Sequence, residues 1–174
     1  LWDFYMFQIH RLRKVHADPH PGNFLINEDA QLIALDFGCM KSIPDEFYTP
    51  YFELSDKKII DNPILFKEKL YELEILTATD TPEELTFFTA MFHELLTVFT
   101  LPFHEAVFDF SNPAFFNKIG DLAERYSKNT ELRKYNGNRG SKHFIYINRT
   151  FFGLYNLMFD LKASAVKINQ FKNY

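Results

Sequence analysis

The spacing of apolar residues along the chain predicts a protein built mainly from amphipathic helices. The first of these helices covers residues 1–14, where apolar side chains recur at helical intervals. Its apolar face holds Trp2, Tyr5, Ile9 and Leu12. Pro44 is expected to open another helix after a short irregular segment.

Three later helices are predicted to begin with the same device, a capping residue followed by proline at the first helical position. The starts are Asn62-Pro63, Thr81-Pro82 and Asn112-Pro113. Thr81 and Glu84 also have the spacing of a capping box, in which each side chain accepts a hydrogen bond from the other residue's backbone amide.

Apolar stripes follow two of these starts and recur near the end of the chain. The stripes are Leu85, Phe88, Phe92, Leu95 and Phe99; Phe116, Ile119, Ala123 and Tyr126; and Phe151, Leu154, Met158, Leu161 and Ala165. The last stripe predicts a helix from about residue 148 to residue 168. Residues 129–142 are predicted to form a loop, with Asn136-Gly137 and Arg139-Gly140 as turn signals.

One segment has the pattern of a β-hairpin. Residues 24–26 and 31–35 are rich in strand-forming side chains, and the polar residues 27–30 separate them as a turn. Such a hairpin would bring Asn23 and Asp36 side by side at its open end. The predicted fold class is therefore mainly α with one small β-hairpin.

Three residues around this hairpin have the side chains that phosphoryl transfer requires. The reaction needs a base or orienting group for the acceptor and metal ions on the phosphates. Asp18 can accept a proton or orient a nucleophile, whereas Asn23 and Asp36 offer an amide oxygen and a carboxylate to Mg²⁺. The alternative is structural: a polar turn with a buried aspartate that caps a loop.

Residues 16–23 read His-Ala-Asp-Pro-His-Pro-Gly-Asn, and residues 36–38 read Asp-Phe-Gly. Ala17 and His20 stand where ordinary protein kinases have Arg and Lys. This wording resembles the signature of the ABC1/UbiB/AarF family of atypical kinases, also called ADCK or Coq8. The resemblance implies Asp18 as the catalytic residue, Asn23 and Asp36 as Mg²⁺ ligands, and His20 near the phosphates of ATP.

The same resemblance implies a kinase-like carboxy-terminal lobe over residues 1–174. Residues 1–15 would form the helix that leads to the catalytic loop. Residues 16–38 would supply that loop, the hairpin and Asp-Phe-Gly, and residues 44–174 the helical bundle. Residues 144–155 also resemble the carboxy-terminal helices of some bacterial members.

Two absences shape the expected activity. No glycine-rich nucleotide loop, strand Lys with helix Glu, or Lys-x-Gly-Gln motif precedes residue 16, so the chain is expected to be one lobe of a longer kinase. Only five residues, 39–43, separate Gly38 from Pro44, and they lack the Ala-Pro-Glu of a peptide-docking segment. A small molecule, a lipid-like intermediate or plain ATP hydrolysis therefore fits better than a protein substrate.

Composition excludes several classes of protein. A net charge of −4 gives no reason to expect nucleic-acid binding, and the single cysteine excludes an internal disulfide.

The 21 phenylalanines are expected to fill a helical core. The alternative is that an exposed subset of them contacts a membrane or a lipid. A basic run before the last helix is interpreted as a solvated surface, or alternatively as a contact for anionic lipid headgroups. It comprises Arg125, Lys128, Arg133, Lys134, Arg139, Lys142 and Arg149.

The leading hypothesis is an ABC1/UbiB-type kinase or ATPase that uses ATP and Mg²⁺. The resemblance implies a role in isoprenoid quinone (ubiquinone) biosynthesis at membranes. It also implies a cytoplasmic or peripheral membrane location in bacteria and a mitochondrial or plastid one in eukaryotes. The alternatives are a phosphotransferase of the aminoglycoside or choline kinase type and a non-catalytic lobe that binds a lipid or a partner.

Two further patterns in the sequence have the residue types of a metal site. His16, Asp18 and His20 have side chains that can bind zinc. Their place in the candidate catalytic loop accounts for each of them without a zinc ion. His93-Glu94 begins like a metalloprotease motif, but Thr97 stands at the second His position and excludes it.

Overall fold

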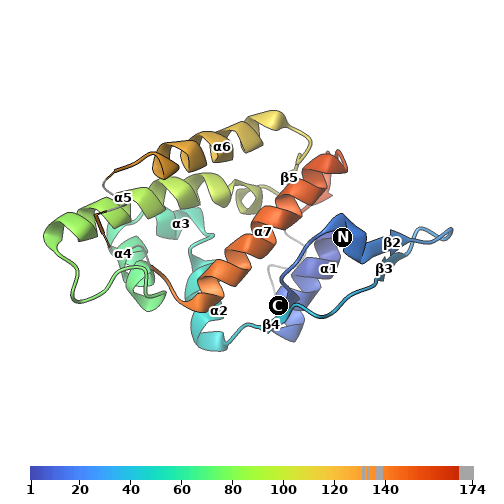
Figure 1. Ribbon diagram of the computed structural model, residues 1–174, viewed down its shortest axis with the longest axis horizontal. Coiled ribbons are helices and arrows are strands. Elements are labelled where there is room, and N and C mark those ends of the chain that lie inside the picture. The colour runs from blue at the N-terminus through green and yellow to red at the C-terminus, as the bar shows by residue number, and fades with distance from the viewer. Residues whose placement is uncertain (131, 133, 136–138, 169–174) are drawn as a thin grey trace.

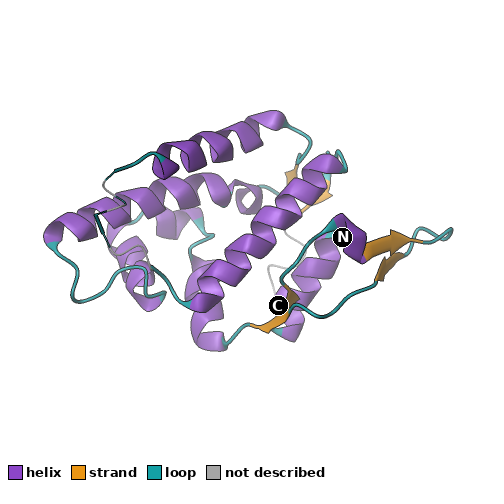
Figure 2. Cartoon of the chain, in the orientation of Figure 1, coloured by secondary structure: helices purple, strands orange, loops and turns teal. Residues whose placement is uncertain are grey.

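The computed structural model describes residues 1–130, 132, 134–135 and 139–168, and within them it is mainly helical (Figures 1 and 2). The helices are α1 (Trp2–Phe7), the π-helix η1 (Gln8–Leu12), α2 (Asp45–Glu53), α3 (Lys57–Ile60), α4 (Pro63–Glu72), α5 (Pro82–Phe99), α6 (Pro113–Ser127) and α7 (Lys142–Asp160), with short 3₁₀ turns η2 (Pro21–Asn23) and η3 (Leu101–His104). The strands form three antiparallel pairs. They are β1 (Lys14–His16) with β4 (Met40–Ser42), β2 (Phe24–Ile26) with β3 (Leu32–Ala34), and β5 (Val107–Phe108) with β6 (Val166–Lys167). The predicted mainly α fold class and the β2–β3 hairpin are confirmed, whereas the β1–β4 and β5–β6 pairs were not predicted from the sequence.

The first helix ends two residues earlier than predicted. Arg13 has a left-handed backbone, with φ of 51°, and Lys14 already belongs to β1. Trp2, Tyr5 and Ile9 are buried as expected. The placement of Leu12 on the same face was wrong, because the wider π-helical turn rotates it outward and leaves it 51% exposed.

The predicted helix starts at α4, α5 and α6 are confirmed. The side-chain oxygens of Asn62 and Asn112 accept hydrogen bonds from the first backbone amides of α4 and α6. At α5, Thr81 Oγ1 accepts from the Glu84 amide at 3.2 Å, and Glu84 Oε2 accepts from the Thr81 amide at 2.9 Å. The capping box is therefore complete.

The buried faces of α5 and α6 differ in how well they were predicted. Phe88 and Phe92 of α5 are buried in the core, and the other members of that stripe pack against it. On α6 the buried residues are Phe115 and Leu122, which the stripe did not include. The predicted Phe116, Ile119 and Tyr126 are partly buried and pack against the core, and only Ala123 is exposed.

The long central helix α7 lies between α5 and α6 on one side and the amino-terminal segment on the other (Figure 1). The predicted bounds of this helix were wrong, since it begins at Lys142 and ends at Asp160. Lys162 has a positive φ of 55°, after which residues 166–167 pair with β5. The predicted stripe members Leu161 and Ala165 therefore lie beyond the helix and are exposed. Within the described residues, no helix has the length and apolar character needed to cross a membrane.

Arg139 contradicts the interpretation of the basic run as solvated surface. Its side chain is only 8% exposed, and Nη1 and Nη2 lie 2.6 Å from Asp80 Oδ1 and 3.3 Å from Glu84 Oε1. Its guanidinium also lies 4.0 Å from the centre of the Phe88 ring. The turn at Arg139-Gly140 is confirmed by a φ of +81° at Gly140. Arg133 and the predicted turn at Asn136-Gly137 lie outside the described residues.

Replacing this buried arginine should destabilise the fold more than replacing an exposed one. Arg139→Gln would leave the carboxylates of Asp80 and Glu84 without their cation, and we expect it to lower the free energy of unfolding by about 3 kcal/mol. The control is Lys128→Gln, which removes an exposed ion pair with Glu124 and should change it by less than about 1 kcal/mol. Urea denaturation measures both. Equal losses would mean that Arg139 contributes no more than a surface charge.

The pH dependence of stability tests the same cluster. Burial raises the pKa of Asp80, but hydrogen bonds from Arg139 and Thr77 outweigh it and hold the pKa below its ordinary value of 3.8. The ionised carboxylate therefore stabilises the fold above that value, and this contribution is lost as the pH falls through the lower folded pKa. In acid titrations of unfolding, Asp80→Asn should show a weaker loss of stability below about pH 4 than the unmodified chain. Identical acid profiles would contradict this assignment.

Candidate active site

The pairing of β1 with β4 brings the two candidate loops to one end of a short ladder. His16 faces Met40, the Ala17 amide donates to the Cys39 carbonyl at 3.0 Å, and the strands are antiparallel. The loop with Asp18 leaves β1 at this end, and the segment from Asp36 enters β4 there. The residues after Asp-Phe-Gly are therefore held as a strand.

The predicted hairpin is confirmed, and it positions Asn23, the third candidate site residue. Strand β2 pairs with β3 in the register Leu25 to Ile33, and the Leu35 amide donates to the Asn23 carbonyl at 2.9 Å. Asn23 thus lies opposite Leu35 at the open end, and Asp36 follows directly. The hairpin is fixed to α1 by Phe24, whose ring packs edge-on against Phe4 at 5.9 Å between centroids.

Asn23 is hydrogen-bonded to Asp18. Its Nδ2 donates to the Asp18 carbonyl at 3.0 Å and to Asp18 Oδ2 at 3.4 Å. Because the amide nitrogen serves these contacts, Oδ1 is the atom of Asn23 that remains to bind a ligand. One side chain therefore orients the candidate catalytic carboxylate and also presents an oxygen of the kind that Mg²⁺ binds.

Asp36 is exposed and held by its own turn. Its Oδ1 accepts a hydrogen bond from the Gly38 amide at 2.7 Å. A Cβ at Gly38 would lie 3.2 Å from that oxygen, so glycine keeps the turn tight. Oδ2 makes no hydrogen bond within the described part of the chain. A carboxylate and an amide oxygen are hard ligands, and this donor set fits Mg²⁺.

The two histidines of the loop have different surroundings. His20 is exposed, and its Nδ1 accepts a hydrogen bond from the Gly22 amide at 3.1 Å, which leaves Nε2 as the donor of a neutral ring. His16 is only 2% exposed, and its backbone amide donates to Gln8 Oε1 at 2.9 Å. Among the described residues, no three His, Cys, Asp or Glu side chains form a group that could hold a metal ion.

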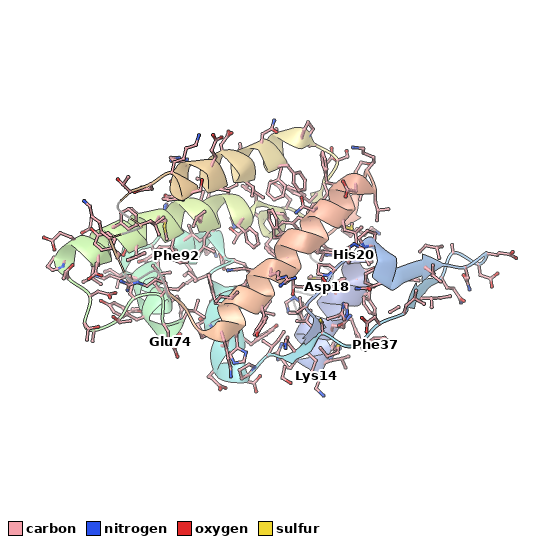
Figure 3. The ribbon with its side chains drawn as sticks, viewed as in Figure 1. Lys14, Asp18, His20, Phe37, Glu74 and Phe92 are labelled. Atoms are coloured by element: carbon pink, nitrogen blue, oxygen red, sulfur yellow. The ribbon has the colours of Figure 1, made fainter. Side chains whose placement is uncertain are left out.

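Two residues near the site carried no functional signal in the sequence. Tyr5 is fully buried, and burial together with the charge of Asp18 raises the pKa of its hydroxyl, so the phenol stays neutral behind the loop. Gly153 of α7 lies so close to the loop that a Cβ there would be 2.4 Å from Pro19 Cγ. Asp18 and His20 accordingly lie beside α7 in Figure 3.

Comparison with known families identifies the segment that carries this site. Residues 1–62 match the model of the ABC1 atypical kinase-like domain. The match runs from α1 to just after α3 and so includes Asp18, Asn23 and Asp36.

Individual relatives match stretches of 31 to 83 residues. The chain is 39% identical over 83 residues to the chloroplastic protein ACTIVITY OF BC1 COMPLEX KINASE 7 of Arabidopsis thaliana, which is 43% of this chain and 11% of that protein. It is 58% identical over 31 residues to the chloroplastic ACTIVITY OF BC1 COMPLEX KINASE 3 of the same plant, which is 18% of this chain and 4% of that protein. An uncharacterized chloroplastic aarF domain-containing protein kinase of A. thaliana is 53% identical over 38 residues, 22% of this chain and 6% of that protein. The chain thus spans about a tenth or less of these relatives.

These matches confirm the sequence-based recognition of an ABC1-type kinase segment. The roles assigned to individual site residues stay predictions, as does the division of the chain at residues 15, 38 and 44.

The contact between α7 and the catalytic loop can be tested with two glycines. Gly153→Ala would force Pro19 to move, and we expect a loss of about 1–3 kcal/mol in the free energy of unfolding. Gly120→Ala on α6 meets nothing within 4 Å and should stabilise by about 0.5–1 kcal/mol. Urea denaturation measures both, and NMR of the Asn23 side-chain amide should report a shift only for Gly153→Ala. An unchanged signal would show that α7 does not position the loop.

Proposed function

We propose that this chain forms part of a Mg²⁺-dependent, ATP-using phosphoryl-transfer site of an ABC1-type kinase or ATPase. The observation that carries the proposal is the hydrogen bonding of Asn23 Nδ2 to the carbonyl and carboxylate of Asp18. It holds the Asp18 carboxylate next to Asn23 and leaves Asn23 Oδ1 without a hydrogen bond from the described residues. A phosphoryl-transfer site needs an orienting group for the acceptor close to the ligands of the metal ion.

Each site residue has one role in this proposal. Asp18 orients the acceptor hydroxyl or a water and takes its proton. Asn23 Oδ1 and the carboxylate of Asp36 hold Mg²⁺, which neutralises charge on the phosphates when it is bound. His20 donates from Nε2 to a phosphate oxygen, and as a neutral ring it stabilises developing charge less than a lysine would.

The proposed acceptor is a small or lipid-like molecule, or water. Strand β4 uses the segment after Asp-Phe-Gly to pair with β1, so within the described residues that segment offers no docking loop for a peptide. The family match favours the ABC1 type over the aminoglycoside or choline kinase type. A role in isoprenoid quinone biosynthesis at a membrane is part of this proposal. A plastid location is supported by three relatives that are named as chloroplastic.

One face of the hairpin supports the view that another part of the active protein covers the site. Leu25, Ile33 and Leu35 share a face of the hairpin opposite to Phe24, and they are 53%, 41% and 53% exposed. An exposed cluster of apolar side chains is typical of a surface that contacts another domain, protein or ligand. We propose that the amino-terminal lobe of the kinase packs on this face and completes the ATP pocket.

The decisive variant is Asp36→Asn in the native protein. It keeps the size of the side chain but removes a charged Mg²⁺ ligand, so ATP turnover should fall by more than the roughly 10- to 100-fold seen when an outer-shell partner is lost. Asp29→Asn makes the same chemical change in the exposed turn of the same hairpin and should leave turnover unchanged. Release of ADP at varied Mg²⁺ concentration measures both.

Asp18→Asn separates the catalytic role from metal binding. Turnover should fall by about 10²- to 10⁴-fold while the affinity for Mg-ATP, measured by calorimetry, is kept. Unchanged turnover in both Asp18→Asn and Asp36→Asn would overturn the proposal and leave the non-catalytic binding lobe as the better hypothesis.

A further inference from the structure

An apolar groove lies between α5, α6 and α7, outside the candidate active site. Its volume is about 460 Å³. It is lined by apolar side chains that include Leu95 and Phe99 of α5, Ile119 and Ala123 of α6, and Phe144 and Phe152 of α7. We call it the α5–α7 groove. Phe92, which also lines it, and Asp18 lie on opposite sides of α7 in Figure 3.

The two polar residues that line the groove are Asn148 and Arg149, which are adjacent on α7. Arg149 is exposed, and it makes no hydrogen bond or ion pair with any residue that the structure describes. Asn148 Oδ1 accepts from the Tyr51 hydroxyl at 2.7 Å, which leaves its amide hydrogens as donors. The polar part of the groove therefore offers a positive charge and donors.

Glu94 precedes the groove residue Leu95 on α5, and its carboxylate already has other partners. Glu94 accepts from the Tyr126 hydroxyl at 2.6 Å and from Arg125 Nη1 at 2.5 Å. The hydrogen bond from Tyr126, and to a smaller extent the one from Arg125, holds the pKa of Glu94 below its ordinary value. The Glu94 carboxylate therefore stays ionised and paired. Glu94 is not among the residues that line the groove.

We propose that the α5–α7 groove binds a free long-chain carboxylic acid. The hydrocarbon chain lies along the phenylalanine and leucine side chains, and the carboxylate accepts hydrogen bonds from Arg149 and Asn148. Small-molecule sites have volumes of about 300–1,000 Å³, apolar walls and a few placed polar groups, and this groove fits that description. The site does not depend on the proposed phosphoryl-transfer activity.

Binding can be measured with a fluorescent probe, dansyl-undecanoic acid, and its displacement by saturated acids from decanoic to palmitic acid. Affinity should rise by up to about four-fold for each added CH₂, because each one buries more apolar surface. The alcohol of the same chain length should bind about ten-fold more weakly, since it lacks the charge that Arg149 pairs with.

Two pairs of variants of the full chain locate the site. Arg149→Gln should weaken the acid about ten-fold and leave the alcohol unchanged, whereas Lys142→Gln, an exposed cation on α7 outside the groove, should change neither. Ala123→Trp fills the groove from an exposed helical position and should abolish displacement. Ala90→Trp is the matched change on α5. Ala90 lines a separate pocket between α4 and α5, so this variant should leave displacement of the probe unchanged. Far-ultraviolet circular dichroism checks that each variant folds.

Several outcomes would overturn the proposal. Equal affinity for acid and alcohol, or equal behaviour of Arg149→Gln and Lys142→Gln, would remove the assigned role of Arg149. Binding that survives in a folded Ala123→Trp variant would place the ligand elsewhere. Binding of vesicles without binding of free acid, or concentration-dependent dimers that exclude the probe, would identify a membrane or a second copy of the chain as the occupant. Asp36→Asn should bind the probe normally, so failure here is distinct from failure of the phosphoryl-transfer proposal.

Discussion

The antiparallel pairing of β1 with β4 is the constraint on which the candidate site depends. It fixes the end of the first helix, because Arg13 must leave the helix for Lys14 to enter the ladder. It also anchors the loop of Asp18 and the segment of Asp36 at the same end. The β2–β3 hairpin then has only to fold back on itself, and the hydrogen bond from the Leu35 amide to the Asn23 carbonyl closes the arrangement.

Helix α7 separates the site from the rest of the molecule and supports it. Phe151 and Tyr155 are fully buried, and the ring of Tyr155 lies within aromatic-contact distance of Trp2 and Phe110. This packing joins α7 to the first helix, while Gly153 lets the same helix approach Pro19. The site side of α7 is therefore tightly packed, and its other side opens onto the apolar α5–α7 groove.

Features with local physical causes were predictable from the sequence, and features with distant causes were not. The capping box at Thr81 and the hairpin follow from residues a few positions apart, so their spacing was sufficient. The β5–β6 pair joins residues about sixty positions apart, and this pairing is why the end of α7 was misplaced. The burial of Arg139 depends on Asp80, and the need for glycine at position 153 depends on Pro19. For the site itself, the sequence supplied the residue types but not the hydrogen bond that aligns Asn23 with Asp18.

The central claim is that Asn23 and Asp36 hold the metal ion of Mg-ATP beside Asp18. The most direct measurement is paramagnetic broadening by Mn²⁺-ATP of the side-chain NMR signals of the native protein, with labelled asparagine and aspartate. The account predicts strong broadening of Asn23 and Asp36 and little change at Asp29 in the exposed turn of the same hairpin. Broadening that spares Asn23 and Asp36 would contradict it.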